Sequence, residues 1–187
     1  MRRLCCLLLF SLTVSPVWAD ITYERMAELT DSPAELSGSF KQQKYLSDFE
    51  THINSSGEFH YQRDQAIQWN TLSPIKNELQ LTPDGITSKQ GKKQLSALKS
   101  ADHQAIKQIN DIFFAVLTAQ WDQLANYFEL SGQETDGAWQ ITLTPKHASL
   151  QQGFQRLELS GDRLLRQAKM IEKNGDSTHI RFDNLTQ

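Results

Sequence analysis

The segment Gly57-Glu58-Phe59-His60-Tyr61-Gln62-Arg63, followed by Ala66-Ile67-Gln68-Trp69, decides the class of fold. Apolar and polar residues alternate in both runs, which is the period of two of a half-buried β-strand. Only the stretch around Asp64-Gln65 separates the runs. They therefore predict two neighbouring strands joined by a short turn.

The same alternation continues on both sides of this segment. Before it, Leu36, Gly38 and Phe40 alternate with polar residues. After it, two short strands are expected around a tight turn: Glu78–Leu81 and Gly85–Ser88, joined by Pro83-Asp84-Gly85.

The second half of the chain repeats this pattern of strands and turns. Asn-Gly and similar pairs favour hairpins because both residues tolerate positive φ. Three such turns are expected: Asp136-Gly137 before Trp139–Thr144, Ser160-Gly161-Asp162 between Leu157–Leu159 and Leu164-Leu165, and Asn174-Gly175 between Lys169–Ile171 and Thr178–Phe182. About nine to eleven short strands are expected in all.

Two stretches have helical periodicity instead. Residues 21–32 predict a short amphipathic helix that Pro33 ends. Residues 102–127 predict a longer helical region, with Asp102 as its cap and a break near residues 119–121. Its apolar stripe is formed by Ile106, Ile109, Phe113, Leu117, Trp121 and Leu124. We expect a mainly β fold with helices (α+β), in which two or three helices cover the concave face of a curled antiparallel sheet.

The N-terminus is typical of a secretory signal peptide. Arg2 and Arg3 precede an apolar run, and cleavage is expected after Ala19. An uncleaved membrane anchor is the alternative, but the run is shorter than the roughly 20 residues that a spanning helix needs. Both cysteines, Cys5 and Cys6, lie inside this segment. The predicted organisation is a signal peptide over residues 1–19 and a single cysteine-free domain over residues 20–187.

Composition and motifs exclude several classes of function. After cleavage, 17 basic residues stand against 22 acidic ones, so nucleic acid is not an expected partner. The motifs of hydrolases, metalloproteases and nucleotide-binding proteins do not occur in the sequence. Neither a metal nor a cofactor is expected, because the five histidines are dispersed. The protein is expected not to be an enzyme; a hydrolase built from dispersed carboxylates such as Asp48 and Glu158 is the remote alternative.

Arg63 is a charged residue in line with two aromatic residues. By strand parity it shares a face with Phe59 and Tyr61. Burial of an unpaired guanidinium would cost several kcal/mol. Either Arg63 lies at the rim of the sheet with its head in water, or it donates hydrogen bonds to groups such as the free carbonyls at a helix C-terminus.

These residues resemble a known family. Gly57-x-Phe59-x-Tyr61-x-Arg63, with Trp69 and Pro74 beyond it, looks like the signature segment of the LolA family of periplasmic lipoprotein carriers. The stretches Phe113–Leu117 with Trp121, and Ile141–Lys146, strengthen the likeness. It runs over nearly the whole mature chain, from about residue 21 to residue 182.

The resemblance implies an unclosed antiparallel β half-barrel covered by a helical lid, of the LolA/LolB type. It also implies a periplasmic carrier that binds the acyl chains of lipoproteins in an apolar cavity and transfers them from the inner to the outer membrane. The expected partners are an acylated passenger, an inner-membrane donor complex and an outer-membrane receptor, and the carrier is expected to be a monomer. Arg63 stands where the family has an arginine that latches the lid.

Ten residues are expected to line the cavity, although each is equally consistent with an ordinary core: Phe40, Phe59, Tyr61, Ile67, Trp69, Leu79, Leu81, Phe113, Phe114 and Leu117. Two features depart from the family pattern. The chain ends at Gln187 without the expected C-terminal tail, and residues 87–98 are rich in lysine. A carrier of another lipid or glycolipid is therefore one alternative. A periplasmic scaffold subunit with a packed interior is a second alternative.

Overall fold

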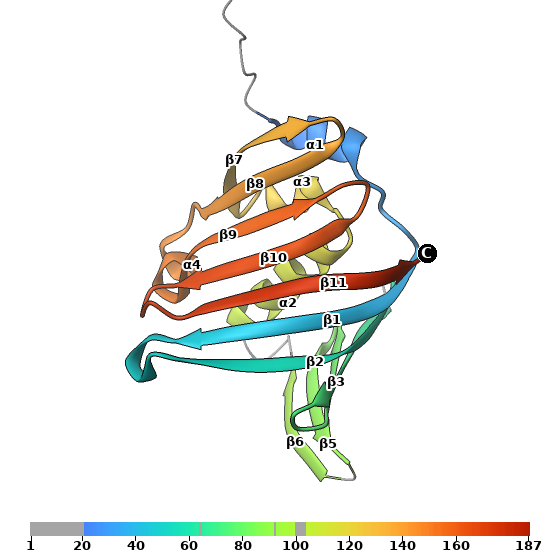
Figure 1. Cartoon of the computed structure of the whole chain (residues 1–187), viewed down its shortest axis with the longest axis vertical. Helices are drawn as coiled ribbons and strands as arrows, with labels where there is room; N and C mark the ends of the chain where they lie inside the picture. The colour runs from blue at the N-terminus through green and yellow to red at the C-terminus, as the bar shows by residue number, and fades with distance from the viewer. Residues whose placement is uncertain (1–20, 64, 92, 100–103) are drawn as a thin grey trace, which may run out of the picture.

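The computed structural model describes residues 21–187 apart from positions 64, 92 and 100–103. Its main element is one antiparallel sheet of eleven strands, which curls around the helices on one side (Figure 1). This confirms the expected unclosed half-barrel of mainly β structure with a helical cover. The predicted signal peptide and the predicted cap Asp102 lie outside the described residues.

The strands form two series of hairpins. Across the sheet their order is β6-β5-β4-β3-β2-β1-β11-β10-β9-β8-β7. In chain order they are β1 (Glu35–Leu46), β2 (Thr51–Gln62), β3 (Ala66–Ser73), β4 (Asn77–Thr82), β5 (Gly85–Gln90), β6 (Lys93–Lys99), β7 (Phe128–Thr135), β8 (Ala138–Pro145), β9 (Phe154–Gly161), β10 (Leu165–Glu172) and β11 (Ser177–Thr186).

Strands β1 and β11 join the two series in the middle of the sheet. Phe40 lies opposite Phe182 in this pairing, and both side chains are buried. Turn chemistry explains the local hairpins, since Gly137 and Gly175 have φ values of 79° and 91°. The four predicted turns at residues 83–85, 136–137, 160–162 and 174–175 are confirmed, whereas Asp64 of the turn predicted at Asp64-Gln65 lies outside the described residues. The β1–β11 pairing is added by the structure.

Four α-helices and one short 3₁₀ helix accompany the sheet. They are α1 (Tyr23–Leu29), α2 (Gln104–Leu117), α3 (Trp121–Leu124), α4 (Ala148–Gly153) and the 3₁₀ helix η1 (Ser47–Phe49). The predicted break after α2 is confirmed, and Ala119 within it has a φ of 54°. Helix α4 was not expected, because its six residues are too few to produce an apolar period.

The connection that carries α2 and α3 spans the sheet. It links β6 to β7, which are the two opposite edges of the sheet. A connection between opposite edges must cross one face, and Figure 1 shows α2 and α3 behind the strands. The curl of the sheet makes this the concave face, so topology alone places these helices as its cover.

Two apolar clusters fill the space between sheet and helices. We call one the aromatic cluster; its buried members are Leu36, Phe40, Phe59, Tyr61, Ile67, Trp69, Leu81, Leu117 and Phe182. We call the other the tryptophan cluster; its buried members are Ile21, Met26, Ile112, Ala115, Trp121, Leu124, Phe128, Trp139, Ile141, Leu143, Leu150 and Leu159. Helix α2 contributes to both clusters.

Candidate functional site

The aromatic cluster contains all ten residues that were expected to line a cavity. Seven of them are buried members of the cluster, and Leu79, Phe113 and Phe114 pack against it while remaining partly exposed. They come from β1 to β4 and from α2. The structure therefore brings the predicted residues together on the concave face, and their role as a lining stays a prediction.

Trp69 lies at the centre of the cluster. Its ring stacks on that of Phe40 with 3.9 Å between centroids, and the centroid of Phe59 is 6.0 Å away. Phe113 and Phe182 meet the indole edge-on, at 5.8 and 6.2 Å. Such edge-to-face and offset pairs add roughly 0.5–1.5 kcal/mol each to the free energy of burial.

A glycine makes room for these rings. A Cβ atom added to Gly57 would lie 1.9 Å from the carbonyl oxygen of Asn70 and 2.9 Å from Cε1 of Phe40. No side chain fits at such distances. The glycine that opens the signature segment is thus explained by the close approach of β3 and of the Phe40 ring.

Helix α2 contributes side chains to both clusters, and the predicted stripe is divided between them: Phe113 and Leu117 join the aromatic cluster, and Trp121 and Leu124 of α3 join the tryptophan cluster. Phe113, Phe114 and Leu117 turn toward the aromatic cluster, whereas Ile112 and Ala115 belong to the tryptophan cluster. The ring of Phe114 meets that of Tyr61 at 6.3 Å. The side chains of Ile106 and Ile109 lie outside the described part of the helix.

In this structure the aromatic cluster is occupied by its own side chains. Neighbouring ring centroids are already 3.9 to 6.3 Å apart, so a ligand must displace rings to enter. Grooves of about 610 and 600 Å³ lie instead on the convex face, among polar side chains such as Gln140, Lys169 and Asn54. The expected cavity would therefore be a second, opened state.

Phe182 belongs to the site and was not predicted. It lies opposite Phe40 and meets Phe59 edge-on at 5.4 Å. Its alternation with Ile180 marks it as inward-facing, but the sequence does not indicate that β11 pairs with β1. Without that pairing, no local signal places Phe182 beside residues of the first strands.

Arg63 lies at the rim of the sheet, one residue after β2 ends, and it is exposed. Its Nη2 donates a hydrogen bond to the carbonyl of Ser32, and its backbone N–H donates to the carbonyl of Ala34 at 2.8 Å. Ser32 lies between α1 and β1. The predicted position at the rim is therefore found. The hydrogen-bond acceptor is a backbone carbonyl that follows α1, as the second alternative expected of a helix C-terminus. The latch role stays a prediction.

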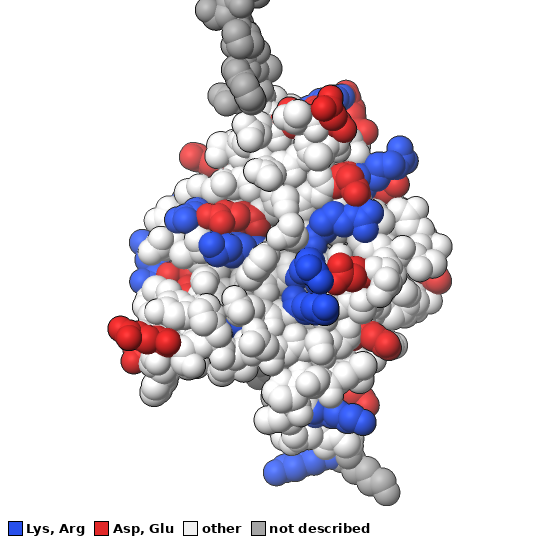
Figure 2. All heavy atoms as spheres, in the orientation of Figure 1, with Lys and Arg blue, Asp and Glu red and all other residues white. Residues whose placement is uncertain are grey.

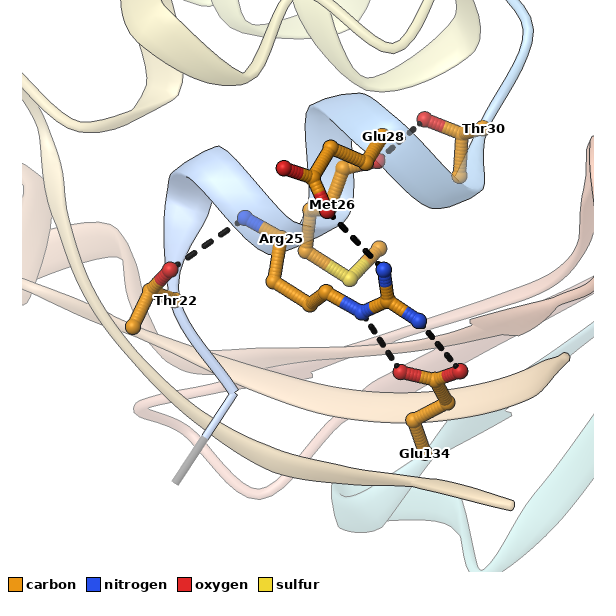
Figure 3. Close-up of polar contacts among 6 residues, drawn as sticks. All are labelled: Thr22, Arg25, Met26, Glu28, Thr30 and Glu134. Carbon is orange, nitrogen blue, oxygen red and sulfur yellow. Dashed lines mark hydrogen bonds and ion pairs between the residues drawn. The ribbon is translucent and has the colours of Figure 1, made fainter. Parts of the chain in front are cut away.

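Helix α1 is fastened to the sheet by polar contacts (Figure 3). The guanidinium of Arg25 binds Glu134 of β7 through two hydrogen bonds of 2.9 Å, and a third bond of 2.9 Å reaches Glu28. The bonds from Arg25 hold the pKa of Glu134 below its usual value. At the start of the helix, Thr22 Oγ1 accepts from the backbone N–H of Arg25 at 3.2 Å, an N-cap.

Further polar contacts surround the tryptophan cluster. The indole of Trp121 donates to Thr30 Oγ1 at 2.7 Å, and that of Trp139 donates to the carbonyl of Asp162. The phenol of Tyr23 donates to the carbonyl of Phe128 at 3.0 Å, and burial raises its pKa to about 12. These bonds join α1 to α3 and to β7, and they join β8 to the turn between β9 and β10.

The acidic side chains of the described residues are dispersed. Among the described residues there is no group of three or more His, Cys, Asp or Glu side chains that could hold a metal ion. Asp48, Glu50 and Glu58 are exposed, and Glu158 is paired with Arg156 and Lys169. None of the described helices has the length and apolar character needed to cross a bilayer.

Comparison with known proteins gives one family. The family model "Outer membrane lipoprotein carrier protein LolA" matches residues 32–187. No curated protein sequence matches the chain.

Three solved structures resemble the chain at low sequence identity. A LolA superfamily protein from Nitrosomonas europaea is 7% identical, with 88% of this chain and 90% of that chain covered and a TM-score of 0.45. The MucA/MucB complex of Pseudomonas aeruginosa gives 16% identity, coverage of 81% and 51%, and a TM-score of 0.42. A putative outer membrane lipoprotein-sorting protein domain from Vibrio parahaemolyticus gives 6%, 87% and 89%, and 0.40.

Proposed function

The chain belongs to the LolA family, and from this premise we propose that it carries the acyl chains of lipoproteins beneath α2, from the inner to the outer membrane. Proteins of this family are periplasmic carriers that are generally not enzymes. We place this protein in the periplasm as a monomer, after removal of residues 1–19. Its partners would be an inner-membrane donor complex and an outer-membrane receptor.

The observation that carries the proposal is the aromatic cluster between α2 and strands β1 to β4. Its described contacts with α2, such as Trp69 with Phe113 and Tyr61 with Phe114, join apolar or aromatic groups. An acyl chain offers the same kind of surface. It can replace the rings of Phe113 and Phe114 against the sheet, because one apolar group then takes the place of another.

Release is explained by the same packing. Each buried methylene stabilises a bound chain by about 0.8 kcal/mol, so full burial in an open cavity would hold several chains almost irreversibly. Here the rings of the cluster close on one another when the passenger leaves. The free energy of that closure offsets part of the binding, which permits transfer to a receptor.

A fluorescent fatty acid tests the proposal directly. The purified protein is expected to take up the probe, and Phe113→Asp is expected to abolish uptake because it places a carboxylate against Trp69. Val116→Asp is the matched control, since Val116 is also half-buried on α2 but packs against the tryptophan cluster. The control should lose stability and retain uptake.

A nitroxide-labelled fatty acid adds the position of the bound chain. Quenching of tryptophan fluorescence is expected to fall strongly in Trp69→Phe, because Trp69 is at the centre of the site. If the wild-type protein takes up neither probe, the carrier function is excluded and a scaffold with a packed interior is favoured.

A further inference from the structure

Five large apolar side chains of the described residues are exposed, and all five lie toward one end of the sheet. They are Phe49, Ile53, Leu72, Ile75 and Leu95, whose exposed fractions are 48–76%. Phe49 and Ile53 lie at or near the β1–β2 connection, Leu72 and Ile75 where β3 turns into β4, and Leu95 near the start of β6. Antiparallel order brings these ends together. Single exposed apolar residues are ordinary, but a set gathered at one end indicates an interaction surface.

Two of these residues lie at irregularities of the sheet. The register shifts between β2 and β3 at Ser56/Gly57, where Leu72 is the extra residue of β3. A second shift between β5 and β6 at Ser88/Lys89 leaves Leu95 as the extra residue of β6. Bulges re-aim side chains away from the regular alternation. Here they coincide with leucines that are about half exposed.

The charges beside these residues differ between Phe49 and the group formed by Leu72, Ile75 and Leu95. Leu72, Ile75 and Leu95 are accompanied by the exposed lysines Lys76, Lys89 and Lys93, with Glu78 opposite Lys89. Figure 2 shows blue side chains on the lower projection, which β5 and β6 form in Figure 1.

Phe49, by contrast, lies between two exposed carboxylates, Asp48 and Glu50. We call the first group, Leu72, Ile75 and Leu95 with the three lysines, the lysine-flanked edge.

We infer that the lysine-flanked edge docks on the surface of a bilayer that contains anionic lipid. Apolar side chains enter the boundary between head groups and acyl chains, and each nearby lysine is attracted to the negative surface. Lysine stems also lie along the apolar boundary while their ammonium groups stay in water. The acidic surroundings of Phe49 exclude it from the same contact, because an anionic surface repels Asp48 and Glu50.

Docking in this way would place the strands that carry the aromatic cluster next to the membrane. Leu72 follows Trp69 by three residues on β3, and Leu79, opposite Trp69, lies on the strand that Ile75 and Lys76 precede. An acyl chain leaving the bilayer would thus meet the cluster without crossing water. This step rests on the proposed function, whereas the docking itself does not.

Vesicle sedimentation tests the inference. The purified protein is mixed with phosphatidylcholine vesicles with and without phosphatidylglycerol. We expect binding to the anionic vesicles that weakens with salt, and an affinity about tenfold lower for the double variant Ile75→Ser/Leu95→Ser. The triple variant Lys76→Gln/Lys89→Gln/Lys93→Gln should lose the preference for phosphatidylglycerol. The matched control, Phe49→Ser, should sediment like the wild type.

The inference is overturned if the double variant sediments like the wild type, or if Phe49→Ser weakens binding equally. It is also overturned if the edge instead joins two copies of the chain, seen as a dimer that the double variant abolishes. Uptake of the fluorescent fatty acid in vesicle-free solution separates the two proposals. A protein that binds vesicles but takes up no probe retains the docking surface and loses the carrier function.

Discussion

The aromatic cluster and the tryptophan cluster share helix α2, but they are held together differently. Around the tryptophan cluster, Arg25 and Tyr23 join α1 to β7 through bonds to Glu134 and to the carbonyl of Phe128. The indole of Trp121 joins α3 to Thr30 at the end of α1. In the aromatic cluster, the described contacts of Phe113 and Phe114 with the sheet are between rings. Among the contacts of the described residues, the tryptophan cluster is thus bordered by directional bonds, and the contacts of Phe113 and Phe114 are ring packing.

This difference indicates where the protein opens. Breaking the part-buried bonds of Tyr23 and Trp121 would leave polar groups unpaired, which costs about 1–3 kcal/mol for each group. Exchanging one apolar neighbour for another costs much less, provided that the volume stays filled. If the proposed passenger enters beneath α2, we expect it to enter on the side of the aromatic cluster, while α1 and α3 stay attached to β7 and β8.

Trp139→Ala should have the largest effect on stability. Trp139 is buried, meets Trp121 edge-on and donates to a backbone carbonyl. We expect the free energy of unfolding, measured by urea denaturation, to fall by about 3–5 kcal/mol. Fatty-acid uptake by the folded fraction should not increase. A loss below about 1 kcal/mol would mean that the tryptophan cluster is not the fixed side.

Phe113→Ala should cost less, because the ring is only half-buried. We expect a loss of about 2 kcal/mol in the same measurement. Uptake of the fluorescent fatty acid, followed by stopped flow, should become faster, since fewer ring contacts must be displaced. Slower uptake would contradict the view that the packing against Phe113 is the barrier to entry.

Arg63→Leu should leave stability nearly unchanged and impair transfer. The side chain is exposed, so its removal leaves no buried charge without a partner. If the bond to Ser32 helps to close the site, the variant should retain its passenger longer in a transfer assay with acceptor membranes. Transfer at the wild-type rate would exclude the latch role.

Arg25→Gln should have the smallest effect, and one that depends on pH. The pKa of Glu134 is lowered in the folded protein, chiefly by the bond from Arg25. Its stabilising contribution is therefore present above the unfolded pKa of about 4.3 and is lost as pH falls through the folded pKa. The Tm of the variant should lie slightly below that of the wild type at neutral pH, and the difference should vanish in acid. A difference that persists in acid would assign the effect to packing.

Local chemistry made much of the fold predictable. Asp136-Gly137 and Asn174-Gly175 mark their turns, and the alternation around Phe59 and Tyr61 marks the inward face. The pairing of strands that are far apart in the sequence cannot be predicted from local residue patterns. Phe40 therefore predicts a buried position without indicating that Phe182 will face it.

The site shows the same limit. Ten residues could be assigned to one apolar surface, because parity and the helical period decide which way a side chain points. Whether rings fill or line the space depends on distances between elements. The position of the charged side chain of Arg63 was harder to predict. By parity Arg63 continues β2, but it lies just beyond the last residue of that strand, Gln62, at the rim of the sheet.

The connection that carries α2 and α3 begins at one free edge of the sheet and ends at the other. Because this connection is attached to the sheet at both ends, it cannot rotate away from the sheet about one end. For α2 to move away from the sheet, the connection must bend, or β6 and β7 must move with it. Filling the space beneath it would then alter the curvature of the whole sheet, flattening or tightening the arc between β6 and β7. If the proposed passenger binds beneath α2, its binding is expected to change the positions of the two edge strands, β6 and β7.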